Sequence, residues 1–140
     1  MRPYQNYQRI NISTADPVRM IVLLYEGALK NLNQAIPLMG VDNMSASVKI
    51  TRTLDIINYL RNVLDFEKGG EIAVNLARLY DYMRNTLALA NINQEQEQVK
   101  TVIGLLQTLL EGWRGVVGTQ AGASAEQPPV NRDRNARPPV

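Results

Sequence analysis

The chain has 140 residues, with 15 basic and 13 acidic side chains and a net charge of +2. A chain of this length suits one domain. The near balance of positive and negative charges argues against nucleic acid or an anionic membrane surface as the partner. Histidine and cysteine are both absent, which removes the commonest metal ligands and most nucleophilic or proton-shuttling arrangements. We therefore expect no zinc site and regard an enzyme as the weaker interpretation, although carboxylate pairs and Ser or Lys chemistry stay open.

No segment approaches the roughly 18 apolar residues of a membrane span, and residues 1–10 lack the apolar core of a signal peptide. The missing cysteines fit a reducing compartment. We therefore expect a cytoplasmic protein without direct membrane insertion.

Residues 1–15 are polar and show no clear period, although Tyr4, Tyr7, Ile10 and Ile12 stand among the Gln, Asn and Arg residues. We interpret this segment as an extended N-terminal arm.

The first helix is predicted from Asp16, which suits an N-cap, and Pro17, which suits the first helical position. Apolar residues then recur with the spacing of a core-facing helix, at Val18, Ile21, Val22, Tyr25, Ala28, Leu29, Leu32, Ala35, Ile36 and Met39. Pro37 should kink or shorten this helix near its end, and Gly40 should stop it.

Three further helices follow in the same way. The second is predicted over about residues 45–64, with Ala46, Ile50, Leu54, Ile57, Leu60 and Leu64 inward. The third is predicted over about residues 71–90, with Ile72, Leu76, Leu79, Tyr80, Met83 and Leu87 inward. The fourth follows a break in which Asn93 can cap, and its stripe is Val99, Val102, Ile103, Leu106, Leu109, Leu110, Trp113, Val116 and Val117.

The pair Gly69 and Gly70 separates the second helix from the third, and we interpret it as a tight structural turn. An anion site at the following helix start is the alternative, but Glu67 and Glu71 flank the glycines and oppose an anion. A cation site made by Asp65, Glu67 and Glu71 has no further ligand spacing to support it.

From Gly118 the composition changes to Ala, Gly, Ser, Gln, Pro and Arg, which cannot bury enough apolar surface to offset chain entropy. The sequence thus predicts an all-α protein: an arm over residues 1–15, an antiparallel four-helix bundle over residues 16–117, and a disordered tail over residues 118–140.

The first helix carries a second apolar face, since Met20, Leu23, Leu24 and Gly27 lie roughly opposite its core stripe at 100° per residue. A corner helix of a small bundle cannot bury both faces in the bundle. The N-terminal arm, a foreign apolar segment, or each in turn would cover this face. The alternative is that Met20 and Leu23 fill a wide seam of the bundle.

On the third helix, Tyr82 flanks the core stripe beside Asn75. Asn75 either caps the end of a neighbouring helix or forms hydrogen bonds with the backbone of a bound peptide.

Two stretches make the sequence similar to a known family. "ADPVRMIVLLYEGALKNL" at 15–32 resembles the opening helix of the FliS family of flagellar secretion chaperones, and "LDFEKGGEIAVNLARLYDYM" at 64–83 resembles its most distinctive block. "ALANIN" at 88–93 and "GLLQTLLEGW" at 104–113 match later landmarks in order. Pro37 departs from the family pattern, and the chain beyond Gly118 lies outside the matched region.

This resemblance implies a cytosolic chaperone with no catalytic activity and no cofactor. Its client would be the disordered C-terminal segment of flagellin, which wraps around the bundle, becomes partly helical and is kept from polymerising before export. The complex would dock on the cytoplasmic domain of FlhA, the gate protein of the flagellar type III export apparatus. The arm, with Tyr4, Tyr7 and Ile10, would contribute to that contact.

We therefore predict a client-binding groove formed by Met20, Leu23, Leu24, Gly27, Asn75 and Tyr82. The alternative function is a non-catalytic helical adaptor or regulator that binds a folded partner. The oligomeric state is left open, with a homodimer among the alternatives.

Overall fold

The structure is a computed structural model that describes residues 17–126, with side chains described as far as Val117. The predicted cap Asp16, the arm residues Tyr4, Tyr7, Ile10 and Ile12, and residues 127–140 lie outside the described part. The chain divides into two compact units, residues 21–110 and residues 1–20 with 111–140. Of the second unit the structure describes only the first turn of one helix and the last turns of another.

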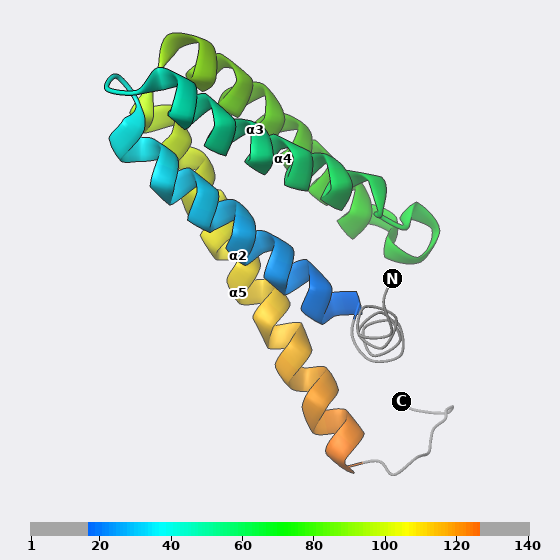
Figure 1. Ribbon diagram of the computed structural model, residues 1–140. Helices are drawn as coiled ribbons and strands as arrows, with labels where there is room; N and C mark the ends of the chain where they lie inside the picture. The colour runs from blue at the N-terminus through cyan, green and yellow to red at the C-terminus, as the bar shows by residue number, and fades with distance from the viewer. Residues whose placement is uncertain (1–16, 127–140) are drawn as a thin grey trace, which may run out of the picture. The chain divides into compact units, whose positions relative to one another are not determined.

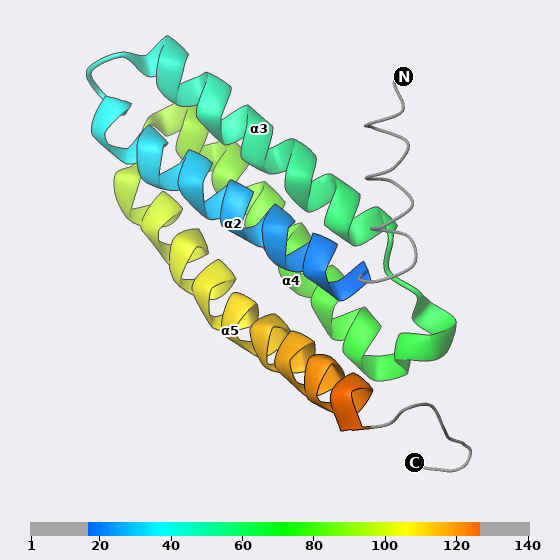
Figure 2. The ribbon, with the colours of Figure 1, turned by 60° about the horizontal axis from the view of Figure 1, so that its bottom comes forward.

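Four α-helices and one 3₁₀ turn make up the described chain. They are α2 (Pro17–Ala35), η1 (Ile36–Leu38), α3 (Asn43–Asn62), α4 (Phe66–Asn93) and α5 (Gln96–Glu126). Within residues 21–110 the helices run antiparallel, α2 lies beside α3 and α5, and α4 lies beside α3 (Figures 1 and 2). The prediction of an all-α antiparallel four-helix bundle is confirmed.

The core of residues 21–110 is the predicted one at most positions. Fully buried side chains come from all four helices, and the largest are Tyr25, Tyr80, Leu32, Ile50, Ile57, Leu60, Met83, Leu87 and Leu106. The prediction that Ile72 points inward is wrong, because its side chain is 71% exposed and Ala73 takes the buried position. The buried stripe of α4 begins at Ala73 and continues through Leu76, Ala77 and Tyr80. The larger apolar side chain of Ile72 therefore misleads a prediction of which residue is buried.

The end of α2 follows from Pro37, which shortens the helix as predicted. The α-helix stops at Ala35, and Pro37 lies in the 3₁₀ turn, where it has no N–H to donate. The Met39 N–H donates to the carbonyl oxygens of Ala35 and Ile36 at 3.1 and 3.2 Å, which keeps Met39 buried. Asp42 then caps α3, accepting from the Ser45 N–H at 3.2 Å and the Ser45 hydroxyl at 2.7 Å.

The glycine pair lies inside α4, after its first turn. Asp65 caps that turn by accepting from the Lys68 N–H at 3.0 Å, and Gly70, with φ 51° and ψ −127°, breaks the helix before it resumes. A side chain at Gly69 would place its Cβ 2.8 Å from the Cβ of Ala73. The link between α3 and α4 is therefore residues 63–65, and the glycines set the angle between one helical turn and the rest of α4.

Two predicted boundaries at the later helices are wrong. Asn93 is the last residue of α4 and does not cap α5; Gln94 closes α4 in the left-handed conformation at φ 53°, and its N–H and that of Glu95 both donate to the Ala90 carbonyl. In addition, α5 continues through Glu126, past the boundary predicted at Gly118. Three alanines stand in residues 118–126, and alanine is the best helix former.

Candidate functional site

The residues of α2 that are predicted to bind a client are not enclosed by the bundle. Leu23 is 59% exposed, while Leu24 and Gly27 are partly buried. Met20 is also partly buried and belongs to the other compact unit, so it is described by its own exposure alone. Leu23 is thus a large apolar side chain in water on a helix whose opposite face fills the core.

The neighbour of this face is α3. A Cβ placed on Gly27 would lie 3.7 Å from Cδ1 of Ile56, and the Thr53 hydroxyl donates to the Ala28 carbonyl at 3.4 Å. Because the two helices are antiparallel, one turn back along α2 from Gly27 corresponds to one turn forward along α3 from Ile56. That step brings Leu23 to the level of Tyr59.

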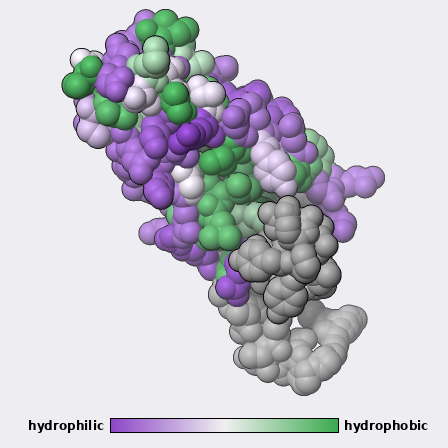
Figure 3. Space-filling view, in the orientation of Figure 1, coloured by the Kyte–Doolittle hydropathy of each residue, from purple (hydrophilic) through white to green (hydrophobic). Residues whose placement is uncertain are grey.

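Two rows of apolar residues therefore run side by side. Tyr59 is 52% and Val63 is 47% exposed, and with Ile56 they follow the i, i+3, i+7 spacing of one helix face. We call the surface formed by Leu23, Leu24, Gly27, Ile56, Tyr59 and Val63 the α2/α3 strip. In Figure 3, apolar side chains gather over α2 in the middle of the view.

The α3 half of the strip is absent from the sequence-based predictions, which take only the core stripe of α3 into account. A signal for it does exist in the sequence. A rotation of 100° per residue places Ile56, Tyr59 and Val63 on one face of α3, in the same way as it reveals the second face of α2.

Asn75 and Tyr82, which are predicted to share the groove with Leu23, lie elsewhere. Asp81 and Arg84 of α4 form hydrogen bonds with α3, whereas Asn75 and Tyr82, seven residues apart, lie on the flank of α4 turned away from α3. Tyr82 is 49% exposed there, and Leu89, one heptad on, is also exposed. The structure therefore divides the predicted groove into the α2/α3 strip and an α4 flank, defined by Asn75, Tyr82 and Leu89.

The contact between α3 and α4 is polar at its rim. Asp81 accepts from Arg61 Nε at 2.8 Å and from Arg84 Nη2 at 2.6 Å, and Arg84 Nη1 donates to Asn58 Oδ1 at 2.8 Å. The hydrogen bond from Arg61 holds the pKa of Asp81 below its ordinary value, and the same bond raises the pKa of Arg61. We call these four residues the α3/α4 clasp. Their hydrogen bonds join α3 to α4 and hold the register of one helix against the other.

The two buried tyrosines belong to the core and not to a site. The hydroxyls of Tyr25 and Tyr80 are 2.6 Å apart, and their rings are tilted by 58° with centroids 6.5 Å apart. Burial is the largest cause that raises the pKa of the Tyr80 hydroxyl. The hydrogen bond between the two hydroxyls ties α2 to α4 across the centre of the bundle.

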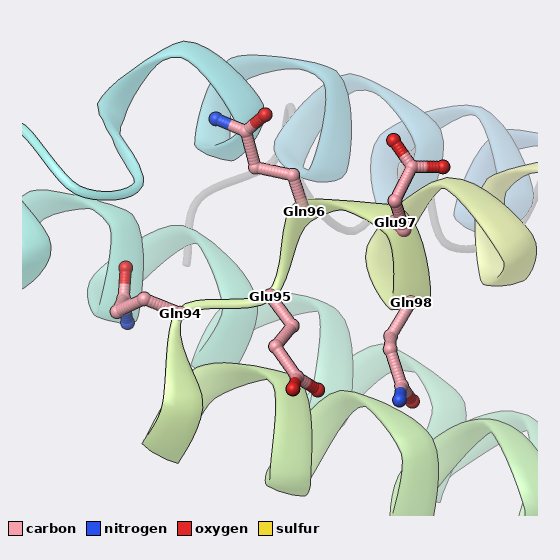
Figure 4. Close-up of a pocket in the computed structure, with 5 residues that line it drawn as sticks. All are labelled: Gln94, Glu95, Gln96, Glu97 and Gln98. Carbon is pink, nitrogen blue, oxygen red and sulfur yellow. The ribbon is translucent and has the colours of Figure 1, made fainter.

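A hollow of about 500 Å³ lies at the link between α4 and α5, lined by Gln94, Glu95, Gln96, Glu97 and Gln98. Figure 4 shows these side chains pointing in different directions, with Gln96 turned towards η1. Gln96 Nε2 donates to the Ile36 carbonyl at 2.9 Å, which ties the start of α5 to the end of α2. Because its polar groups do not converge, this hollow lacks the arrangement of a ligand-binding site.

Metal-binding clusters and membrane spans are both missing from the part of the chain that the structure describes. Among those residues, no three acidic side chains gather where they could hold a metal ion. In the same region, no helix has the length and apolar character to cross a membrane.

Comparisons with known proteins give consistent matches. A family model described as "Flagellar protein FliS" matches residues 1–120. Flagellar secretion chaperone FliSB of Pseudomonas aeruginosa is 37% identical over 121 residues, which cover 83% of this chain and 96% of that protein. Flagellar secretion chaperone FliS of Salmonella typhimurium is 36% identical over 107 residues, which cover 75% of this chain and 79% of that protein.

A solved structure described as a flagellar chaperone from bacteria superposes with a TM-score of 0.70 at 19% identity. The match covers 84% of this chain and 99% of that one. At this level of identity the likeness supports the helical fold, and the sequence matches carry the relationship.

Proposed function

Because the chain belongs to the FliS family of flagellar secretion chaperones, we propose that it binds the C-terminal segment of flagellin and prevents premature polymerisation. It would act in the cytoplasm, without catalysis or a cofactor, and deliver flagellin to the cytoplasmic domain of the export gate protein FlhA. The N-terminal arm, with Tyr4, Tyr7 and Ile10, would contribute to the contact with FlhA.

The observation that carries the client-binding proposal is the α2/α3 strip. Leu23, Tyr59 and Val63 are each about half exposed or more, and they extend the apolar contact of Gly27 with Ile56 along two packed helices. Contiguous apolar surface of this kind marks an interaction site more often than scattered apolar residues do. An amphipathic client helix laid along the strip would place its apolar side chains between the two rows.

The strip alone supplies only part of the affinity. Burying a Leu-sized side chain fully is worth about 1.5–3 kcal/mol, and the remaining exposed part of each strip residue is worth a fraction of that. A client segment that folds on binding loses about 2–5 kcal/mol in ordering. We therefore propose that the client uses the α4 flank as well, so that the interface is extended.

The arm has a second proposed role, which is to cover the α2/α3 strip until the client displaces it. Its four apolar side chains, Tyr4, Tyr7, Ile10 and Ile12, supply the apolar surface that such a contact needs. Competition of this kind would prevent the exposed strip from binding other proteins before flagellin is available.

Replacing Leu23 with Asp tests the client-binding proposal. The side chain is already in water, so the bundle should fold, whereas a charge placed against an apolar client helix should weaken binding about 10–100-fold. Isothermal titration calorimetry with the flagellin C-terminal segment measures the affinity, and circular dichroism checks the fold.

Met44→Asp is the matched control, because Met44 is an exposed apolar residue at the start of α3, about three turns away from Ile56. Its affinity should stay within about twofold of the unmodified chain. Equal affinity for Leu23→Asp and the unmodified chain would remove the strip from the client interface. A chain that ignores the flagellin segment altogether, yet binds a folded partner, would be an adaptor instead.

A further inference from the structure

Basic side chains lie next to one end of the α2/α3 strip. On α2, Lys30 follows Gly27 by three residues, and on α3, Arg52 precedes Ile56 by four. Since Gly27 and Ile56 face each other, Lys30 and Arg52 come to the same level one turn further on. Lys49 lies about one more turn along α3, beyond Arg52.

The positive charges of these side chains are accessible to a binding partner. Lys30 and Arg52 are exposed, and neither they nor Lys49 form an ion pair among the described residues. Two carboxylates are near: Asp55 is exposed three residues after Arg52 on α3, and Glu26 is partly buried four residues before Lys30 on α2. Cations therefore outnumber carboxylates at this end of the strip.

We propose that the segment bound on the α2/α3 strip is an amphipathic helix with acidic side chains about one turn beyond its apolar anchors. The strip has one level at Leu23 and Tyr59 and the next at Gly27 and Ile56, and the basic pair Lys30 and Arg52 forms a third level; successive levels are about one helical turn apart. That repeat matches side chains at i, i+3 or i+4, and i+7 of a client helix. Lys30 and Arg52 pair with the acidic side chains and so select one direction of the client.

This inference rests on the proposed function and adds the charge pattern of the client to it. An anionic membrane or nucleic acid is a poorer match for this surface. Among the described residues only three cations are present there, and they adjoin a strip with the exposed apolar side chains of Leu23 and Tyr59, which a uniformly charged partner would leave uncovered. Exposed charges at the rim of an interface act mainly on the association rate and on its salt dependence. The experiment therefore measures rates.

The test compares two double variants of the full chain, each lacking two positive charges. Lys30→Gln with Arg52→Gln removes the basic end, and Lys68→Gln with Lys100→Gln removes two exposed lysines from α4 and α5. Association of the flagellin C-terminal segment is followed by stopped-flow fluorescence between low and physiological salt. We expect the association rate of the first variant to fall about 3–10-fold at low salt and to lose most of its salt dependence.

The control double variant should stay within about twofold of the unmodified chain. A second arm uses a flagellin segment whose Asp and Glu residues are replaced by Asn and Gln. This segment should bind the unmodified chain more slowly and bind the Lys30/Arg52 variant without further loss.

Three results are decisive. Equal rates for the two double variants would overturn the inference, as would an unchanged rate for the neutralised segment with the unmodified chain. If the unmodified chain binds neither form of the flagellin segment, the proposed function itself fails.

Discussion

Gly70 has a φ of 51° and a ψ of −127°, a combination that L-residues with a side chain rarely adopt. The sequence predicts a break at the glycine pair, because two adjacent glycines interrupt a helical pattern. It does not predict which of the two glycines has the positive φ, nor that a capped helical turn precedes it. Both depend on how the backbone resumes the helix after the break.

Replacing Gly70 with Ala should therefore destabilise the protein by about 1–3 kcal/mol, because alanine must be held at positive φ. Urea denaturation followed by circular dichroism measures the free energy of unfolding. Gly104→Ala is the control: Gly104 lies in α5 with no packed side chain within 4 Å of the position that a Cβ would occupy, and this change should stabilise the helix by up to about 1 kcal/mol. Equal effects of the two changes would contradict the strain argument.

At the scale of elements, the helices themselves are predictable because their apolar stripes recur with helical spacing and are bounded by capping residues or prolines. The α2/α3 strip is only half predictable. Leu23 and Leu24 stand out as surplus apolar surface on one helix, but pairing them with Ile56 and Tyr59 requires the alignment of α2 against α3, which the pattern of a single helix does not contain. In the structure Gly27 lies opposite Ile56.

The α3/α4 clasp gives a prediction for acid stability. The pKa of Asp81 lies below the ordinary 3.8 in the folded chain, so its ionised form stabilises the fold above that value. That contribution is lost as the pH falls through the lowered pKa. Urea denaturation as a function of pH should show that Asp81→Asn is less stable than the unmodified chain at pH 7 and that the two curves converge below about pH 4.

Arg61→Gln should show a similar convergence, because the hydrogen bond from Arg61 is the main cause of the lowered pKa of Asp81. Parallel curves for Asp81→Asn and the unmodified chain, with the same difference at every pH, would show that the clasp acts through packing and not through charge.

At the scale of the whole molecule, the bundle is predictable because four stripes of similar length joined by short links have few other ways to be buried. Asn75 and Tyr82 lie on a different flank from Leu23, which the sequence does not reveal, because periodicity gives the face of each helix but not its neighbours. The clasp shows the difficulty, since Asp81 and Tyr82 are adjacent in sequence and lie on different sides of α4.

The proposed competition between the arm and the client predicts the effect of deleting residues 1–12. Affinity for the flagellin C-terminal segment should stay equal or rise, because the strip no longer has to be uncovered, while binding to the cytoplasmic domain of FlhA should weaken. Isothermal titration calorimetry with each partner measures both. Loss of flagellin binding in the shortened chain would contradict displacement and make the arm part of the client site.

The division of exposed apolar surface between the α2/α3 strip and the α4 flank has a consequence for any guest polypeptide that occupies both. The two lie on different sides of the bundle, and a path between them passes over two helices, a distance of the order of 20 Å. Crossing that distance takes at least about six extended residues. Such a guest polypeptide has two binding segments joined by a linker, and it can dissociate from the bundle in two steps instead of one.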